Sequence, residues 1–212
     1  MVKQRSDLRN ARQDKRANQV TIFDQDEYSY QKFEGEQITS DMLHRKCFIG
    51  CEFIRCRFDE VDCTQVTFED CLFRDTGFYS VLLNGTSLIE AEFDGCKFVS
   101  INFSLVNQMI LSFGFQSSKL IACTFDSMNI IKTKFSDCSF DDTIFQECQL
   151  RQSNFENGEF SNTHFRHCNL EKARFVGTEG LALDPLQNKI EKAVFDTRSA
   201  MALLDAFDIT LI

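Results

Sequence analysis

Almost every fifth residue of this chain is large and apolar. The step is most regular from Phe125 to Phe175, where eleven consecutive units keep it. Two residues before most of these large residues lies a small one, as Cys138 lies before Phe140. A period of five matches neither the 3.6 residues of a helical turn nor the two-residue alternation of a strand. It therefore predicts a repeat architecture, which must be recognised before any local propensity is considered.

The same step runs upstream in another phase, from Phe48 to Phe103, with weaker members reaching back to Phe23. The two phases differ by two residues, so we expect a two-residue insertion near residues 106–119. Within that stretch we place it between Phe113 and Leu120. It predicts either a harmless bulge or a short projecting loop at which a partner binds.

A four-sided coil accounts for this period. If each unit forms one side, the large residue and the small residue two positions earlier both point inward. Coils then stack at the strand spacing of about 4.8 Å, which places large residues twenty positions apart on one another. A helix is disfavoured, because positions five, ten and fifteen apart spread around its circumference. The predicted core includes Phe48, Phe53, Phe68, Phe73, Phe140 and Phe160.

The pattern resembles the pentapeptide-repeat family, whose motif is A(D/N)LXX with Leu or Phe at the centre, over about residues 21–177. The resemblance implies an all-β fold, a right-handed quadrilateral parallel β-helix with four units per coil. We divide the chain into a basic and flexible N-terminal arm (1–20), the β-helix (21–195), and a short C-terminal α-helix with its tail (196–212). The arm carries a net charge of +4, which leaves −13 for the rest of the chain.

The C-terminal region carries a closer resemblance. The loop around Pro185, the short helix with a hydrophobic end, and the stretch "FGFQSSKLIACTF" are similar to the Qnr and MfpA group. That group protects bacterial DNA gyrase and topoisomerase IV from quinolones. The likeness implies such a topoisomerase as partner and a homodimer built by the C-terminus. The long projecting loops of Qnr are missing here, and the basic arm is additional.

The C-terminal segment is also predicted to form a dimer interface on physical grounds. A β-helix leaves unpaired strand edges at its ends, and proteins cover such edges or use them for pairing. A single capping helix buries one apolar stripe and leaves the remaining apolar residues without a partner. The candidates for this interface are Leu203, Leu204, Phe207, Ile209 and Leu211.

No catalytic constellation is found, so we expect neither an enzyme nor a cofactor. His164, His167 and Cys168 have the residue types of a zinc site, but in this register the histidines point outward and the cysteine inward. Nine of the ten cysteines occupy inward positions, where they act as small apolar side chains. No apolar run approaches the ~20 residues of a membrane span, and no secretory signal precedes the repeats. We therefore predict free thiols and a cytoplasmic protein that does not bind membranes.

Two hypotheses of different classes remain. In the first, the acidic rod mimics DNA and binds DNA gyrase or topoisomerase IV, without itself binding nucleic acid. In the second, it is a generic protein-interaction scaffold with no topoisomerase partner. Acidic residues spread over all four predicted sides, mixed with basic ones, so no single acidic stripe is predicted. The candidate partner-binding residues are Asp59, Glu60, Asp141, Asp142, Gln116 and Lys119.

Overall fold

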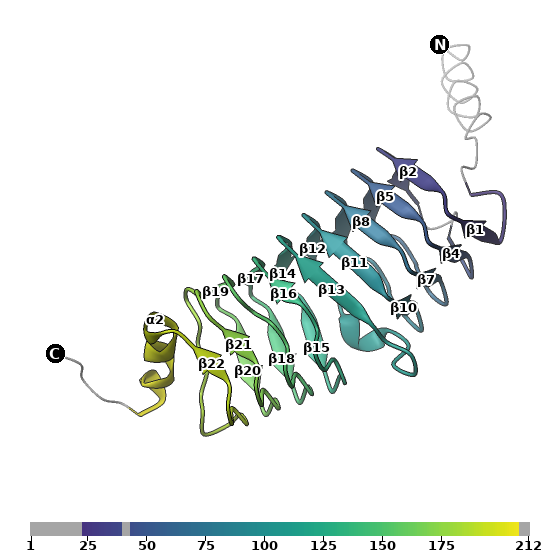
Figure 1. Cartoon of the computed structure of the whole chain (residues 1–212). Helices are drawn as coiled ribbons and strands as arrows, with labels where there is room; N and C mark the ends of the chain where they lie inside the picture. Colours follow the sequence, from purple (N-terminus) through teal and green to yellow (C-terminus); the bar gives the residue numbers. More distant parts are fainter. Residues whose placement is uncertain (1–22, 40–42, 208–212) are drawn as a thin grey trace, which may run out of the picture.

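The protein is a parallel β-solenoid of about eight turns that ends in one short helix (Figure 1). The computed structural model describes residues 23–39 and 43–207. The predicted arm (1–20) and the interface candidates Ile209 and Leu211 lie outside the described residues. Within them, the chain climbs from β1 at one end of the rod to α2 at the other. The predicted all-β parallel β-helix with a short C-terminal helix is confirmed.

Each turn has four sides, which we label A to D in the order in which the chain visits them. Side A begins with a four-stranded sheet of β1 (Glu27–Ser29), β4 (Cys47–Ile49), β7 (Thr67–Glu69) and β10 (Ser87–Ile89). Side B holds β2 (Lys32–Glu34), β5 (Glu52–Ile54), β8 (Leu72–Arg74), β11 (Ala91–Asp94), β13 (Phe113–Gln116) and β16 (Phe135–Ser136). Further along, it holds β21 (Arg174–Phe175) and β22 (Val194–Phe195).

Side C is the longest continuous sheet. Its strands are β3 (Gln37–Ile38), β6 (Arg57–Asp59), β9 (Gly77–Tyr79), β12 (Lys97–Val99), β14 (Lys119–Ile121), β17 (Ser139–Asp141) and β19 (Glu159–Ser161). Side D holds β15 (Thr124–Asp126), β18 (Ile144–Gln146) and β20 (His164–Arg166). All strand pairs are parallel, and most join residues twenty positions apart, as Phe53 joins Phe73.

The corners explain how five residues complete one side. Among the described residues, 23 residues other than glycine have φ between 44° and 64°, nearly all two positions after a central residue. The left-handed conformation costs an L-residue roughly 1–2 kcal/mol. Here it aims the corner N–H at the next turn, so that the Asp70 amide donates to the Ile89 carbonyl at 2.8 Å. The hydrogen bonds between turns therefore offset the local strain.

The core consists of aromatic ladders along each side. Phe73 stacks on Phe53 and on Phe93 with ring centroids 4.9 and 4.8 Å apart and nearly parallel planes. Rings on neighbouring sides meet edge to face, as Phe48 and Phe53 do at 5.3 Å and 70°. Both arrangements suit the charge distribution of an aromatic ring. The six core candidates are all buried: Phe48, Phe53, Phe68, Phe73, Phe140 and Phe160.

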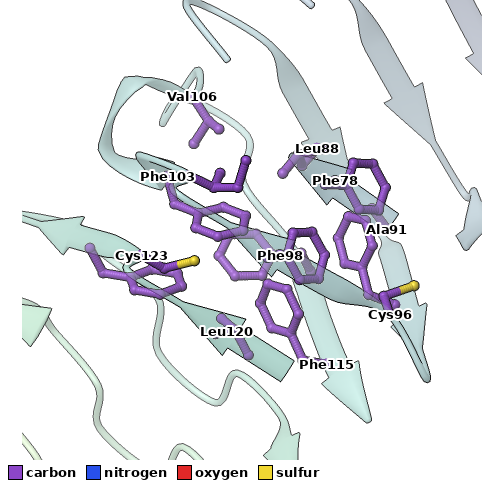
Figure 2. Close-up of a cluster of buried hydrophobic side chains, with 14 of the residues drawn as sticks. Phe78, Leu88, Ala91, Cys96, Phe98, Phe103, Val106, Phe115, Leu120 and Cys123 are labelled. Atoms are coloured by element: carbon purple, nitrogen blue, oxygen red, sulfur yellow. The ribbon is translucent and has the colours of Figure 1, made fainter. Parts of the chain in front are cut away.

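The regular register breaks once, at a loop on side A (Val106–Ser112). Phe93 pairs with Phe115, twenty-two positions away, and Phe103 stacks on Phe125 at the same separation. The loop follows a 3₁₀ turn, η3 (Phe103–Leu105), whose first turn is capped by the Asn102 side chain. Figure 2 shows the side chains of this region, among them Leu88, Phe103 and Phe115, gathered in one cluster across successive turns.

The two-residue insertion lies before Phe113, so its predicted place between Phe113 and Leu120 is wrong. The Asn107 amide still donates to Thr86, with the offset of the regular turns, whereas Phe113 already pairs with Ala91, twenty-two positions earlier. From Phe113 onward the five-residue step is regular. Phe113 lies opposite Ala91, at the inward position that small residues normally occupy. In the loop, Gln108 and Ile110 are exposed, while Leu111 packs against the core.

The described chain ends in one four-residue helix and two short helical turns. The helix α2 (Thr197–Ala200) is capped by Asp196, whose Oδ1 accepts from the Ser199 amide at 2.9 Å. Two 3₁₀ turns follow, η4 (Met201–Leu203) and η5 (Asp205–Phe207). No helix in the described part of the chain has the length and hydropathy of a membrane-spanning segment.

Candidate partner-binding surfaces

Five of the six predicted partner-binding residues share side C. Asp59 lies on β6, Lys119 on β14 and Asp141 on β17, while Glu60 and Asp142 occupy the corners that follow β6 and β17. The register separates Asp59 from Asp141 by four turns, about 19 Å at the strand spacing. The two acidic pairs are therefore parts of one face and not of one contact site.

The partners of these residues limit what they can do. Asp59 forms an ion pair with Arg57 at 2.9 Å, and the Arg57 guanidinium also lies 3.9 Å from the centre of the Tyr79 ring. Asp142 accepts a hydrogen bond from the Asn162 side chain. The sixth candidate, Gln116, lies on side B and donates to Asp137. These acidic groups are exposed, which suits binding rather than proton transfer.

A row of carboxylates that the sequence reasoning missed lies along the edge between sides A and B. We call it the acidic edge: Glu52, Glu69, Asp70, Glu90 and Glu92. Asp70 and Glu90 occupy successive corners, and strand pairing places Glu52 and Glu92 in one column, two turns apart. All five are exposed, and none forms an ion pair within the described residues. Gly114 lies opposite Glu92 and leaves space for its carboxylate.

The acidic edge was detectable in principle. Counting charges over whole sides hides it, because side B also carries Arg74, and side A carries Lys132 and Arg151 further along. A comparison of the corner residues that lie twenty positions apart in the first four turns would have revealed it. Among the described residues, no lysine or arginine occupies its three columns between Gly50 and Glu92.

The loop on side A is the most exposed apolar feature of the described chain. Met109 is 91% exposed and Ile110 66%, and Leu105 precedes them on the same turn. Val106, by contrast, is buried beside Phe103 (Figure 2). The loop thus has an anchored start and an apolar tip, and this suits a protein contact.

The predicted dimer-interface residues differ in exposure. Leu203 packs against the last turn, Leu204 is half-buried, and Phe207 is 49% exposed. An open apolar groove at this end of the rod is lined in part by Phe195, Met201 and Leu204.

The cysteines are free and serve packing. Burial is the main cause that raises the pKa of Cys71, Cys96, Cys123 and Cys138 to about 12 in each case. A thiol with such a pKa is a poor nucleophile at neutral pH. Cys168 points inward and contacts the Phe145 carbonyl oxygen, whereas His167 occupies an outward corner. Among the described residues, no three His, Cys, Asp or Glu side chains are grouped to hold a metal ion.

The chain was compared with known families and structures. Residues 110–175 match the family described as pentapeptide repeat region. No curated protein matches the chain. A trypsin-treated form of QnrB1, described as a plasmid-mediated fluoroquinolone resistance protein, is similar with a TM-score of 0.52 and 16% identity, covering 88% of this chain and 97% of that one.

Two further solved structures are similar at lower scores. Another trypsin-treated QnrB1 has a TM-score of 0.44 at 15% identity, covering 88% of this chain and 100% of that one. HetL, a pentapeptide-repeat protein involved in heterocyst differentiation regulation in the cyanobacterium Nostoc, has a TM-score of 0.36 at 10% identity, with coverages of 79% and 84%. The five-residue repeat, the stacked four-sided turns and the family match agree. The chain contains a pentapeptide repeat region, and its fold is similar to that of QnrB1.

Proposed function

We propose that this protein is a non-enzymatic DNA mimic that binds a type II topoisomerase, DNA gyrase or topoisomerase IV, and protects it against quinolones. The observation that carries the proposal is the acidic edge. Five exposed carboxylates on a rigid rod present a fixed negative field, which attracts a basic DNA-binding surface. The likeness of the fold to QnrB1 suggests which DNA-binding proteins to test first.

The linear charge density of the acidic edge is about half that of duplex DNA. Its five carboxylates span three turns, about 14 Å at the strand spacing, or one charge per ~3 Å. Duplex DNA carries one per about 1.7 Å of axis. Because the carboxylates lie on stacked turns, their spacing is preset and binding does not have to order them.

The length of the rod supports the same proposal if two copies join end to end. Eight turns give about 38 Å at the strand spacing. Two rods then match roughly twenty base pairs at 3.4 Å each. We propose that the C-terminal groove forms this homodimer, because Phe207 and Met201 are exposed there and the last turn ends in unpaired strand edges.

Supercoiling by gyrase in the presence of ciprofloxacin tests the function. We expect the protein to reduce quinolone-induced cleavage, and the double variant Glu69→Gln with Glu90→Gln to lose at least tenfold in potency. The matched control is Glu147→Gln with Glu191→Gln, which removes the same charge away from the acidic edge. Absence of both protection and inhibition at micromolar protein would rule the proposal out.

The dimer has its own test. Leu204→Glu with Phe207→Glu should give a soluble monomer by light scattering at tens of micromolar protein. If the unaltered protein stays monomeric at tens of micromolar, the C-terminal segment is a cap only.

The second candidate function is a protein-interaction scaffold without a topoisomerase partner. The exposed tip of the side A loop favours it, since Met109 and Ile110 offer apolar contact area on a fixed support. Met109→Ser with Ile110→Ser separates the candidates. Under the mimic hypothesis this variant keeps its effect on gyrase, because the acidic edge is unchanged.

A further inference from the structure

Side C carries charges that are segregated along its length. One outward column, read from strand to strand by direct pairing, contains Lys97, Lys119, Ser139, Glu159 and Glu179. Two lysines lie side by side, then a serine, then two glutamates side by side. All four charged residues are exposed.

This order is unfavourable within a single molecule. Like charges directly opposite each other on neighbouring strands destabilise a sheet. Lys97, Lys119 and Glu159 have no ion pair among the described residues, and Glu179 has only the exposed Arg198, at 2.8 Å. Elsewhere the chain pairs charges between turns, as Arg151 pairs with Glu171 at 2.9 Å. Apart from Lys97, whose ammonium lies 6.0 Å from the centre of the Tyr79 ring, the column makes no contact among the described residues that accounts for the segregation.

The order of charges in this column becomes favourable when it faces the same column of a second copy that runs in the opposite direction. We propose that side C is a self-association surface on which a second copy of this chain lies antiparallel, with the twofold axis at Ser139. Lys119 lies one turn before Ser139 and Glu159 one turn after it, while Lys97 and Glu179 lie two turns away on either side. The axis thus brings each lysine onto a glutamate of the second copy, and the contact is isologous.

The shape of side C suits this arrangement. A shallow hollow of about 360 Å³ lies in its acidic half, lined in part by Ser139, Asp141, Glu159 and Glu179. It offers space for the lysine side chains of the second copy. In the basic half, Val99 and Ile121 lie half-buried and add apolar area. The projecting loop leaves from side A, on the opposite side of the four-sided coil, and does not obstruct the contact.

The association should be weak and sensitive to salt. The strip from Lys97 to Glu179 is about 19 Å long at the strand spacing. Its area falls short of the roughly 800 Å² per partner of a stable complex. Exposed charges are screened within about 10 Å at 0.1 M salt, so higher ionic strength should dissociate the pair.

Charge exchange tests the proposal by sedimentation velocity. We expect dimer at roughly 0.1 mM protein, a concentration suited to weak association. The acidic variant Lys97→Glu with Lys119→Glu, and the basic variant Glu159→Lys with Glu179→Lys, should each lose the lateral contact. An equimolar mixture should associate at least tenfold more tightly than either alone, because one column is then wholly acidic and the other wholly basic.

All samples carry Leu204→Glu and Phe207→Glu, which remove the proposed end-to-end contact and keep the two interfaces apart. Asp141→Asn should strengthen the association where the charge reversals weaken it. Asp141 lies beside the axis, and its charge repels the second copy. That variant should associate several-fold more tightly. A mixture that sediments as two monomers, or an association indifferent to these charges, would overturn the proposal.

Discussion

The turns before the side A loop and the turns after it have the same interior. Phe53 stacks on Phe73 at 4.9 Å in the first segment, and Phe140 stacks on Phe160 at 5.0 Å in the second. Small inward residues accompany the rings in both. The two segments differ on their outer surface. Both pair some charges between turns, as Arg74 pairs with Asp94 at 3.7 Å in the first and Arg174 with Glu156 at 2.6 Å in the second, but the acidic edge lies in the first.

This difference separates what folds the protein from what it binds. Inward residues must repeat, because each turn packs only on its neighbours. Outward residues face solvent and are free to vary without cost to the core. The family match covers only the second segment, although the stacking is equally regular in the first. Binding specificity is therefore to be sought in the outward columns.

The largest expected effects test the shared interior. Phe140→Ala should cost roughly 3–5 kcal/mol by leaving a large cavity, and Phe73→Ala in the other segment should cost the same. Urea unfolding measures both. Phe140→Asp should prevent folding of the middle turns, and a soluble, fully folded Asp variant would refute the register. Unequal costs for the two alanine variants would show that the interiors are not equivalent.

The next largest expected effect is the loss of stability at high pH caused by the buried thiols, which both segments contain. Cys71 and Cys96 lie before the loop, Cys123 and Cys138 after it, and burial raises the pKa of each from 9.0 to about 12. Below pH 9 these thiols are protonated in the folded and unfolded states. Between pH 9 and 12 only the unfolded state releases the protons, so stability falls as pH rises, by up to about 1.4 kcal/mol per pH unit for each thiol.

Unfolding in reductant at pH 8 and pH 10 measures this loss. Replacing Cys71 or Cys138 by Ala should reduce the loss between the two pH values by similar amounts. A stability that does not change between pH 8 and 10 contradicts the protonated state of the buried thiols.

Separately, freshly prepared protein in denaturant without reductant should titrate close to ten free thiols.

Two glycines in the left-handed conformation provide a smaller and matched comparison. Gly85, before the loop, and Gly180, at the last turn, have nearly the same φ, +65° and +66°. A Cβ on Gly85 meets only the Gln65 side chain at 3.8 Å, whereas a Cβ on Gly180 falls 2.1 Å from the Phe160 carbonyl oxygen. Gly85→Ala should cost roughly 1–2 kcal/mol for the left-handed conformation alone. Gly180→Ala should cost clearly more, and equal midpoints in thermal unfolding would contradict the close approach.

The sequence predicts the interior better than the outer surface. The five-residue period is enough to place Phe48, Phe68 and the other ladder residues, because only one register buries all of them. The insertion was misplaced because Phe113 and Phe115 each fit one phase, and only the structure, which pairs Phe113 with Ala91, distinguishes the two placements. Corner charges such as Asp70 and Glu90 follow no periodic rule. Their alignment appears only after the twenty-residue register is known.

The smallest expected changes in stability, caused by substitution of single glutamates, should have opposite signs in the two segments. Glu90→Gln removes one of several neighbouring negative charges, so it should stabilise the protein by a few tenths of a kcal/mol, and less at high salt. Glu156→Gln should destabilise it by about 0.2–1 kcal/mol, because it removes a partly exposed ion pair with Arg174. The hydrogen bond from Arg174 is the main cause that lowers the pKa of Glu156. Its contribution is therefore present above the ordinary carboxylate pKa and is lost as pH falls. Urea midpoints at low and high salt would measure both changes, and the same sign for both would contradict the proposed difference between the outer surfaces.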